Sequence, residues 1–201
     1  MIKNVIFDIG NVLISFDWGE YIKELFDDEK TYLTVRDAIF GSDFWNELDR
    51  GVLSRSEMLE GFGKRAPGYE KEIEKAFDMV GRALSGRPYT IPLIGELHSR
   101  GLKVLYLSNY SRHVMAANPD VPEFTKHMDG GIFSCEVKLI KPDPLIYKAI
   151  CDKYGLTPGE CVFIDDNEAN IKAADTFGMK TVHFKNYDQA YKELNDILKA
   201  H

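Results

Sequence analysis

Cysteine and long apolar runs are both scarce in this sequence of 201 residues. The cysteines, Cys135, Cys151 and Cys161, form no C-x-x-C pair, which argues against a disulfide scaffold and against a zinc site built from cysteines. Apolar runs such as Val104–Leu107 and Cys161–Ile164 have four residues, whereas a membrane-spanning helix needs about 20. The N-terminus enters a strand-like run without a basic and apolar signal segment. We therefore expect a cytoplasmic protein with reduced cysteines and no membrane partner.

An excess of basic charge is also missing. The chain has 25 lysine and arginine residues against 32 aspartate and glutamate residues, for a net charge of −7. This balance argues against nucleic acid as a partner, because binding to a phosphate backbone needs a basic surface. A small anionic ligand is still allowed, since local cationic groups can outweigh a distant net charge. The composition, 44% hydrophobic and 28% charged, is globular, and the length favours one main core with a sizeable insertion.

Short apolar runs alternate with helical patterns over most of the chain. Their apolar residues are consecutive, as in strands buried on both faces of a parallel sheet. The predicted strands are Val5–Asp8, Lys103–Leu107, Gly131–Phe133, Cys161–Asp165 and Thr181–Phe184. The predicted helices between them are Pro92–Arg100, Asp143–Tyr154 and Asn167–Phe177, each of which ends at a glycine. This alternation predicts repeated β-α-β units and an α/β fold.

Residues 16–87 interrupt the alternation, because they contain helical patterns and no convincing strand. The predicted helices are Tyr21–Phe26, Thr31–Ile39, Ser42–Leu48, Ser54–Phe62 and Tyr69–Leu84. The run from Ser54 to Glu57 fits a capping box, in which two side chains satisfy backbone donors at a helix start. We interpret the segment as a helical insertion directly after the first strand.

Acidic and polar side chains stand at the ends of three predicted strands. Asp8 ends the first strand, Ser108 and Asn109 follow the second, and Asp165 and Asp166 end the fourth. Ligands of open parallel sheets bind at the carboxyl ends of the strands, so we expect these groups to converge. Converging carboxylates repel one another, and an all-oxygen Mg²⁺ site would neutralise them. The alternative is that Asp8 caps a turn and that one of the paired aspartates caps the next helix.

The same residues lie in four motifs that resemble those of the haloacid dehalogenase-like (HAD) hydrolase superfamily. In chain order the motifs are Phe7–Leu13, Leu107–Asn109, Lys141–Pro144 and Phe163–Asn167. Within the superfamily the sequence looks most like small phosphatases that carry a helical cap after the first motif, including sugar-phosphate phosphatases and the phosphatase domain of soluble epoxide hydrolases. The resemblance implies a Rossmann-like parallel sheet core at 1–15 and 88–201, with an inserted α-helical cap at 16–87.

The resemblance also implies a role for each matching position. Asp8 would attack phosphorus and carry the phosphoryl group, and Lys141 would neutralise Asp8 and the phosphate. Ser108 and Asn109 would donate hydrogen bonds to phosphate oxygens. The Mg²⁺ ligands would be Asp8, the Gly10 carbonyl and Asp166. Asp165 would be either a second carboxylate ligand or the residue that orients Lys141.

Gly10 departs from the common form of the first motif, which has a second aspartate there as general acid/base. The carbonyl ligand survives this change, but the side chain that transfers protons does not. We therefore expect slow turnover or a substrate whose leaving group needs little protonation, such as a sugar phosphorylated at its anomeric oxygen. A second departure is Lys138, where the branch often has glycine; we expect it to be a solvated loop lysine rather than a phosphate contact.

The leading hypothesis is a Mg²⁺-dependent phosphatase that hydrolyses a small phosphorylated metabolite, with a sugar phosphate as one candidate, through an aspartyl-phosphate. One alternative, suggested by Gly10, is a non-catalytic protein that binds a phosphorylated metabolite or regulates through it. The other is a haloacid dehalogenase, which uses an aspartate nucleophile without a metal, so the Asp165–Asp166 pair counts against it. Aromatic cap residues such as Trp45 either stack on substrate or pack in the core. The sequence does not decide the oligomeric state.

Overall fold

Five parallel strands form the central sheet of this computed structural model, which describes residues 1–118 and 120–199. The strands are β1 (Asn4–Phe7), β4 (Lys103–Ser108), β5 (Gly130–Phe133), β6 (Cys161–Asp165) and β7 (Lys180–His183). They are arranged in the order β5-β4-β1-β6-β7, so β1 is central. The predicted parallel sheet is confirmed, and every predicted strand is present within one residue of its expected bounds.

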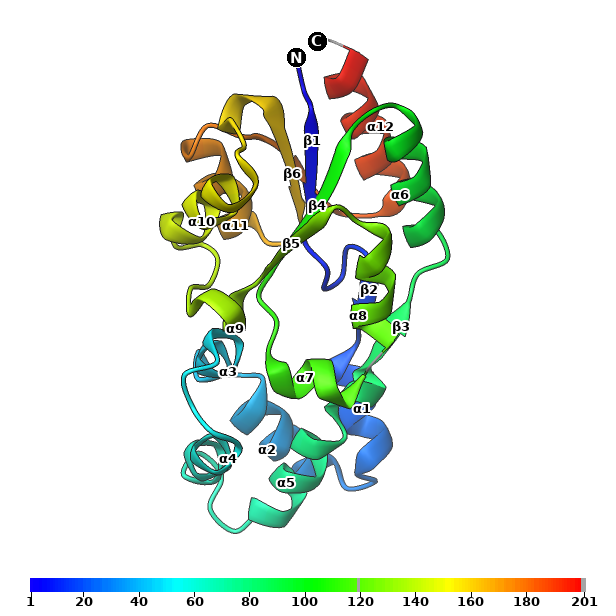
Figure 1. The fold of residues 1–201 in the computed structure, drawn as a ribbon. Helices are drawn as coiled ribbons and strands as arrows, with labels where there is room; N and C mark the ends of the chain where they lie inside the picture. Colours follow the sequence, from blue (N-terminus) through cyan, green and yellow to red (C-terminus); the bar gives the residue numbers. More distant parts are fainter. Residues whose placement is uncertain (119, 200–201) are drawn as a thin grey trace.

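Helices cover both faces of the sheet (Figure 1). The pair α6 (Thr90–Ser99) and α12 (Tyr187–Lys199) lies on one face, and α10 (Pro144–Tyr154) and α11 (Glu168–Thr176) lie on the other. Successive strand side chains point to opposite faces, so Val5 and Phe7 join one core cluster and Ile6 the other. This double burial explains the consecutive apolar residues. The predictions of α6, α10 and α11 are confirmed, whereas the sequence analysis missed α12.

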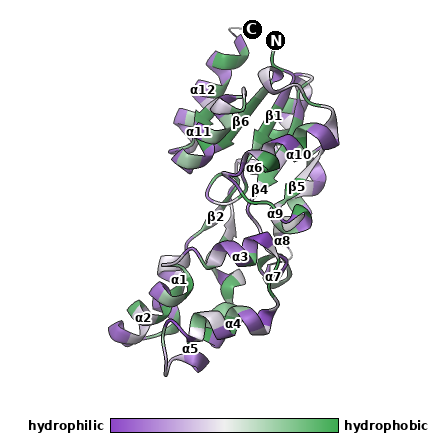
Figure 2. Cartoon of the chain, turned by 90° about the vertical axis from the view of Figure 1, so that its left-hand side faces the viewer, coloured by the Kyte–Doolittle hydropathy of each residue, from purple (hydrophilic) through white to green (hydrophobic). Residues whose placement is uncertain are grey.

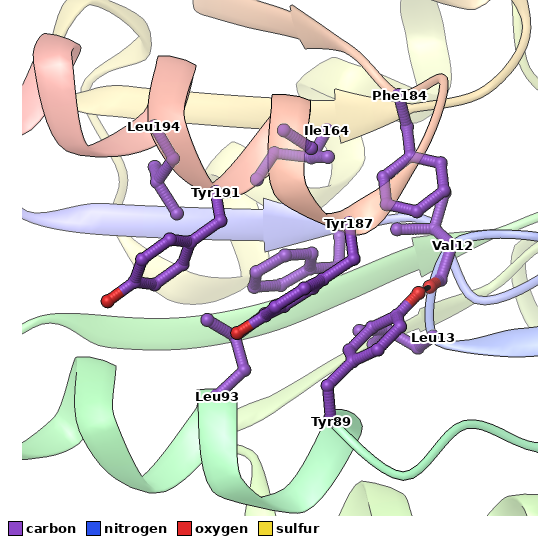
Figure 3. Close-up of a pocket in the computed structure, with 11 residues that line it drawn as sticks. Val12, Leu13, Tyr89, Leu93, Ile164, Phe184, Tyr187, Tyr191 and Leu194 are labelled. Atoms are coloured by element: carbon purple, nitrogen blue, oxygen red, sulfur yellow. Dashed lines mark hydrogen bonds between the residues drawn. The ribbon is translucent and has the colours of Figure 1, made fainter.

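Stacked tyrosines attach α12 to the sheet (Figure 3). The ring of Tyr187 stacks on Tyr89, the residue directly before α6, with centroids 4.2 Å apart, and on Tyr191, with centroids 5.6 Å apart. The Tyr89 hydroxyl donates a hydrogen bond to the Val12 carbonyl. The pocket beside these rings is lined by apolar and tyrosine side chains such as Leu93. It is a gap in core packing without a charged group, and we assign no chemistry to it.

Residues 18–83 form a separate helical layer at the end of the molecule opposite the two termini (Figure 1). Its helices are α1 (Trp18–Leu25), α2 (Glu29–Ile39), α3 (Trp45–Arg50), α4 (Arg55–Gly63), α5 (Glu70–Asp78) and a 3₁₀ turn (Val80–Ala83). A core of its own includes Met58, Phe62 and Phe77, and hydrophilic and hydrophobic residues alternate along these helices (Figure 2). The capping box is confirmed: the Ser54 amide donates to Glu57 Oε2 at 2.8 Å, and the Glu57 amide donates to Ser54 Oγ at 3.3 Å.

The expectation that residues 16–87 contain no strand is wrong at both ends of the segment. Strand β2 (Ile14–Phe16) pairs antiparallel with β3 (Leu84–Gly86), in a register that places Phe16 opposite Leu84. Three residues are too few to show an alternating pattern, and the pairing joins segments about 70 positions apart, so the sequence carries no local signal for it. The two crossings between sheet and helical layer therefore form one hydrogen-bonded ribbon.

Short helices also lie in several of the loops that connect the strands. They are α7 (Arg112–Ala117), α8 (Asp120–Phe124), α9 (Ser134–Val137) and the 3₁₀ turns Thr125–His127 and Pro158–Glu160. Helices α7 and α9 lie between the sheet and the helical layer (Figure 1). Within the described part of the chain, no helix combines the length and the apolar character that crossing a membrane requires.

Removal of the Phe62 ring tests how much the helical layer depends on its own core. Phe62 is fully buried between Phe44 and Phe77, with ring centroids 5.3 and 5.7 Å away. We expect Phe62→Ala to lower the free energy of unfolding by about 3–5 kcal/mol, because it leaves a cavity. Leu33→Ala, at a 36% exposed position of α2, should change it by less than about 0.5 kcal/mol. Urea unfolding followed by circular dichroism measures both, and similar losses would contradict the assignment.

Candidate active site

Asp8 lies where the central strand β1 leaves the sheet. Its amide donates to the Ile164 carbonyl of β6 at 2.8 Å, which continues the parallel pairing one residue beyond β1. This register sets Asp8 beside Asp165, the last residue of β6. Asp8 as a whole is only 8% exposed, and its Oδ1 accepts the Ile9 amide at 2.7 Å. The expected convergence of polar strand ends is therefore present at the centre of the sheet.

The Lys141 ammonium lies between these two carboxylates. Its Nζ is 2.9 Å from Asp8 Oδ1 and 2.6 Å from Asp165 Oδ2, and the lysine side chain is 1% exposed. Among the described residues, the donors to the Asp8 carboxylate both reach Oδ1. The second oxygen, Oδ2, is thus the atom left for an incoming electrophile or a cation.

Both carboxylate oxygens of Asp165 accept hydrogen bonds from other residues of the protein. Besides Lys141, its carboxylate accepts the Asn167 amide at 2.8 Å and the Asn170 side-chain amide at 3.1 Å from each oxygen. These donors fix the carboxylate toward Lys141, which favours the orienting role over direct metal binding. The helix-cap alternative does not hold, because Asn167 is the N-cap of α11.

An oxygen-rich cluster suitable for a divalent cation is present at the same edge. One carboxylate oxygen each from Asp8, Asp165 and Asp166 lies within 4.8 Å of the others. Asp166 is partly exposed, and the Asn11 side chain donates a hydrogen bond to it. Such an all-oxygen set matches the ligands that Mg²⁺ takes. The residues present therefore fit the predicted metal, and the Gly10 carbonyl lies in the loop that follows Asp8.

Burial dominates the electrostatics of this cluster. It raises the pKa of Asp8 to about 7, with Lys141 opposing the rise and Asp165 and Asp166 adding to it. Burial and then Asp165 also raise the pKa of Asp166. For Lys141, burial acts to lower the pKa, but the Asp165 and Asp8 carboxylates outweigh it and raise the pKa above its usual value. Lys141 stays charged, while the carboxylates crowd one another in the absence of further positive charge.

The two predicted phosphate contacts, Ser108 and Asn109, end the neighbouring strand β4. Ser108 is 1% exposed. The Asn109 side chain binds the backbone of Lys141: its Nδ2 donates to the Lys141 carbonyl at 3.0 Å, and its Oδ1 accepts the Lys141 amide at 2.8 Å. That side chain therefore positions the lysine, which leaves the Asn109 backbone as the group able to bind phosphate.

A cavity of about 50 Å³ lies between this edge and the helical layer, next to Gly10, Asn109 and Asp49. Its remaining wall is mostly apolar, from Ile14, Phe16, Trp45, Leu84, Tyr110 and Val114. The space is enough for only a few water molecules. Trp45 lines the cavity and packs on Phe40, with ring centroids 4.8 Å apart, so the packing role is present, and stacking on substrate stays a prediction.

Three polar residues of this site were missed as functional groups by sequence reasoning. Asn11 contacts Asp166 and accepts the Phe16 amide at 3.0 Å, Asn170 holds Asp165, and Asp49 reaches the cavity from the helical layer. Of these three residues, only Asn11 could have been recognised from the sequence, because it lies inside the first motif. Lys138 is exposed, as expected, and it also donates a hydrogen bond to the Gly51 carbonyl of the helical layer.

A family model described as haloacid dehalogenase-like hydrolase matches residues 2–178. The chain belongs to this family. The predicted membership in the HAD hydrolases is therefore confirmed, and so is the predicted α/β fold, because solved HAD enzymes share it.

Curated relatives of this HAD-like hydrolase include a phosphatase and a dehalogenase. Sesquiterpene phosphatase astK of Aspergillus oryzae is 24% identical over 98% of this chain and 96% of its own length. The (S)-2-haloacid dehalogenase 4A of Burkholderia cepacia is 28% identical over 70% of this chain and 58% of its own length. The chain spans between 14% and 58% of the length of the first curated relatives that it matches.

A solved structure with a similar fold is a HAD family enzyme of Bacteroides thetaiotaomicron in complex with magnesium and inorganic phosphate. It is 23% identical, with a TM-score of 0.66 over 92% of this chain and 95% of that chain. At this identity the likeness shows the shared fold.

The Asp165–Lys141 pair of this HAD-like hydrolase can be tested through stability. Asp165→Asn removes one of two buried partners of the Lys141 ammonium, so we expect a loss of about 3–5 kcal/mol in the free energy of unfolding. The control is Asp152→Asn, which breaks the 2.5 Å pair with Lys148 on the surface of α10, where both side chains are over 60% exposed. It should cost at most about 1 kcal/mol. Urea denaturation distinguishes the two, and equal losses would contradict the buried pairing.

Proposed function

We propose that this HAD-like hydrolase is a Mg²⁺-dependent phosphatase that hydrolyses a small phosphorylated metabolite through an aspartyl-phosphate on Asp8. The observation that supports it most is the Lys141 ammonium, 2.9 Å from Asp8 Oδ1, beside three carboxylates with oxygens within 4.8 Å of one another. This arrangement supplies a nucleophile with a fixed positive charge next to it. Phosphoryl transfer depends mainly on such positioning and charge neutralisation.

Each residue of the site would have its own role in this reaction. Asp8 Oδ2 would attack phosphorus while Lys141 balances the charge of the nucleophile and of a phosphate oxygen. Ser108 and the Asn109 backbone would donate hydrogen bonds to the other phosphate oxygens. Mg²⁺, held by Asp8, the Gly10 carbonyl and Asp166, would neutralise phosphate charge when bound. Asp165 would hold Lys141 in place, which makes it a positioning residue.

Residues 16–87 would act as a cap over this edge. The chain enters and leaves the cap only through the β2–β3 ribbon. This connection supports a hinge at the ribbon. Opening would admit substrate, and closure would exclude bulk water from a cavity of about 50 Å³. A cavity of this size favours small substrates over macromolecules.

The cavity walls favour an ester with an apolar organic group. Six apolar or aromatic side chains line the cavity, whereas a sugar would need polar partners for several hydroxyls. A sugar phosphate, suggested by the sequence, therefore stays a prediction to be tested beside alkyl and aryl phosphates. A panel of such esters assayed for released phosphate, with and without Mg²⁺, tests the proposed function. Halide release from 2-haloacids without metal would favour the dehalogenase alternative.

A cytoplasmic location is part of this proposal. All three cysteines are free and buried, which supports a reducing compartment.

The nucleophile is tested by Asp8→Asn. We expect phosphate release to fall below detection, because the amide is too weak a nucleophile to form the phospho-enzyme. The matched control is Asp152→Asn on the exposed surface of α10, which should leave turnover unchanged. Phosphate release and circular dichroism are measured on both variants. A folded Asp8→Asn protein with turnover close to wild type would exclude Asp8 as the nucleophile.

The metal ligand is tested by Asp166→Ala. Because the side chain is partly exposed, its loss should weaken Mg²⁺ binding at least tenfold in calorimetry and lower the melting temperature little. Asp175→Ala, at an exposed position of α11, should leave the affinity unchanged. In crystals with Mg²⁺ we expect oxygens of Asp8 and Asp166 at ~2.0–2.1 Å from the ion. An ion bound elsewhere would contradict the assignment.

A further inference from the structure

Asp49, at the end of cap helix α3, is a buried carboxyl group without an ion-pair partner. It is 8% exposed, and no cationic group of the residues the structure describes lies within ion-pair distance of it. Burial raises the pKa of Asp49 to about 7, and the negative charge of Asp8 adds to the rise while Lys141 opposes it. A buried carboxylate without a partner is costly, so the neutral, proton-carrying form is accessible near pH 7.

Asp49 lines the same cavity as Gly10, where a side chain is missing. Both residues line the same cavity, together with Asn109 at the end of β4. A Cβ placed on Gly10 would meet no atom within 4 Å, and the φ of Gly10 is not in the left-handed region. The fold would therefore accommodate a side chain at position 10, although the sequence has none there. Asp49 supplies a carboxyl group to that cavity from the cap side.

Contacts on both sides of the cavity hold Asp49 in place. The Trp45 side chain donates a hydrogen bond to its carboxyl group. The Ser134 hydroxyl, at the start of α9 in the core, donates to the Asp49 carbonyl at 2.5 Å and accepts the Tyr110 amide at 2.9 Å. Lys138 bonds to the nearby Gly51 carbonyl. These contacts between α3 and α9 fix the residue against the core when the cap is in this position.

We propose that Asp49 is the catalytic acid and base of this enzyme, and that the cap supplies by its closure the proton-transfer group that the first motif lacks at Gly10. The inference rests on the proposed phosphatase function. It gives cap closure a chemical role, because the acid reaches the leaving group only with α3 docked on α9.

The two half-reactions balance with one carboxyl group. As Asp8 bonds to phosphorus, the bond between phosphorus and the ester oxygen breaks, its electron pair goes to that oxygen, and the oxygen takes the Asp49 proton and leaves as alcohol. Asp49, now a carboxylate, then takes a proton from a water whose oxygen bonds to phosphorus. The bond between phosphorus and Asp8 breaks, its electron pair returns to the Asp8 carboxylate, and phosphate leaves with Asp49 protonated again.

The test compares Asp49→Asn with wild type on two esters that differ in leaving group. With n-butyl phosphate the leaving alkoxide needs a proton, so single-turnover formation of the phospho-enzyme should fall about 10²–10⁴-fold. With p-nitrophenyl phosphate the leaving phenolate is stable, so the same step should fall less than about tenfold. The control Glu47→Gln alters an acid two residues away on α3 that pairs with Arg50 at 3.6 Å and should change neither rate.

A purely structural role would lower both rates by the same factor, and this result or an unchanged butyl phosphate rate would overturn the inference. Adding Gly10→Asp to Asp49→Asn should restore the butyl phosphate rate at least tenfold, because the new carboxyl group enters the same cavity. No recovery in a folded, Mg²⁺-binding double variant would also overturn it. Wild-type protein that releases phosphate from neither ester would overturn the proposed function and this inference together, whereas the other outcomes leave the function standing.

Discussion

The buried Lys141 ammonium is the group on which the rest of the site depends. Three carboxylates end two adjacent strands within 4.8 Å of one another, and without a cation among them their mutual repulsion would oppose folding of this edge. Lys141 offsets part of this repulsion by pairing with Asp8 and Asp165. One positive charge against three carboxylates leaves the edge negative, and this residual charge is what makes it a suitable place for a divalent cation.

The groups around Lys141 serve mainly to hold it. Asn109 binds both the amide and the carbonyl of Lys141, and Asn170 binds the carboxylate of Asp165. The two side-chain amides come from different parts of the fold, because Asn109 directly follows β4 and Asn170 lies on α11. Because a buried charge that loses its partner is costly, these contacts keep the nucleophile and its counter-charge in register without any substrate.

Two structural links tie the cap to this edge, and they differ in kind. The β2–β3 ribbon is continuous with the chain on both crossings. The contacts of Ser134 and Lys138 with Asp49 and Gly51 can form only when α3 lies on α9. The small, mostly apolar cavity lies between this edge and the helical layer, so under the proposed function the position of the cap would control which organic group fits and how much water reaches Asp8.

The sequence by itself determined the parallel sheet, the helices α6, α10 and α11, and the polar groups at the strand ends, because each has a local signal. Buried strands give consecutive apolar residues, as in Cys161–Asp165, and strand-end polar groups such as Asp8 and Asp166 follow from position alone. The tertiary structure decided what depends on pairing between distant segments. The ribbon of Ile14–Phe16 with Leu84–Gly86 is one case. The use of the Asn109 side chain to hold Lys141 is another, and the approach of Asp49 to Gly10 is a third. None of these leaves a periodic trace in the chain, since each contact joins segments that lie far apart in the sequence.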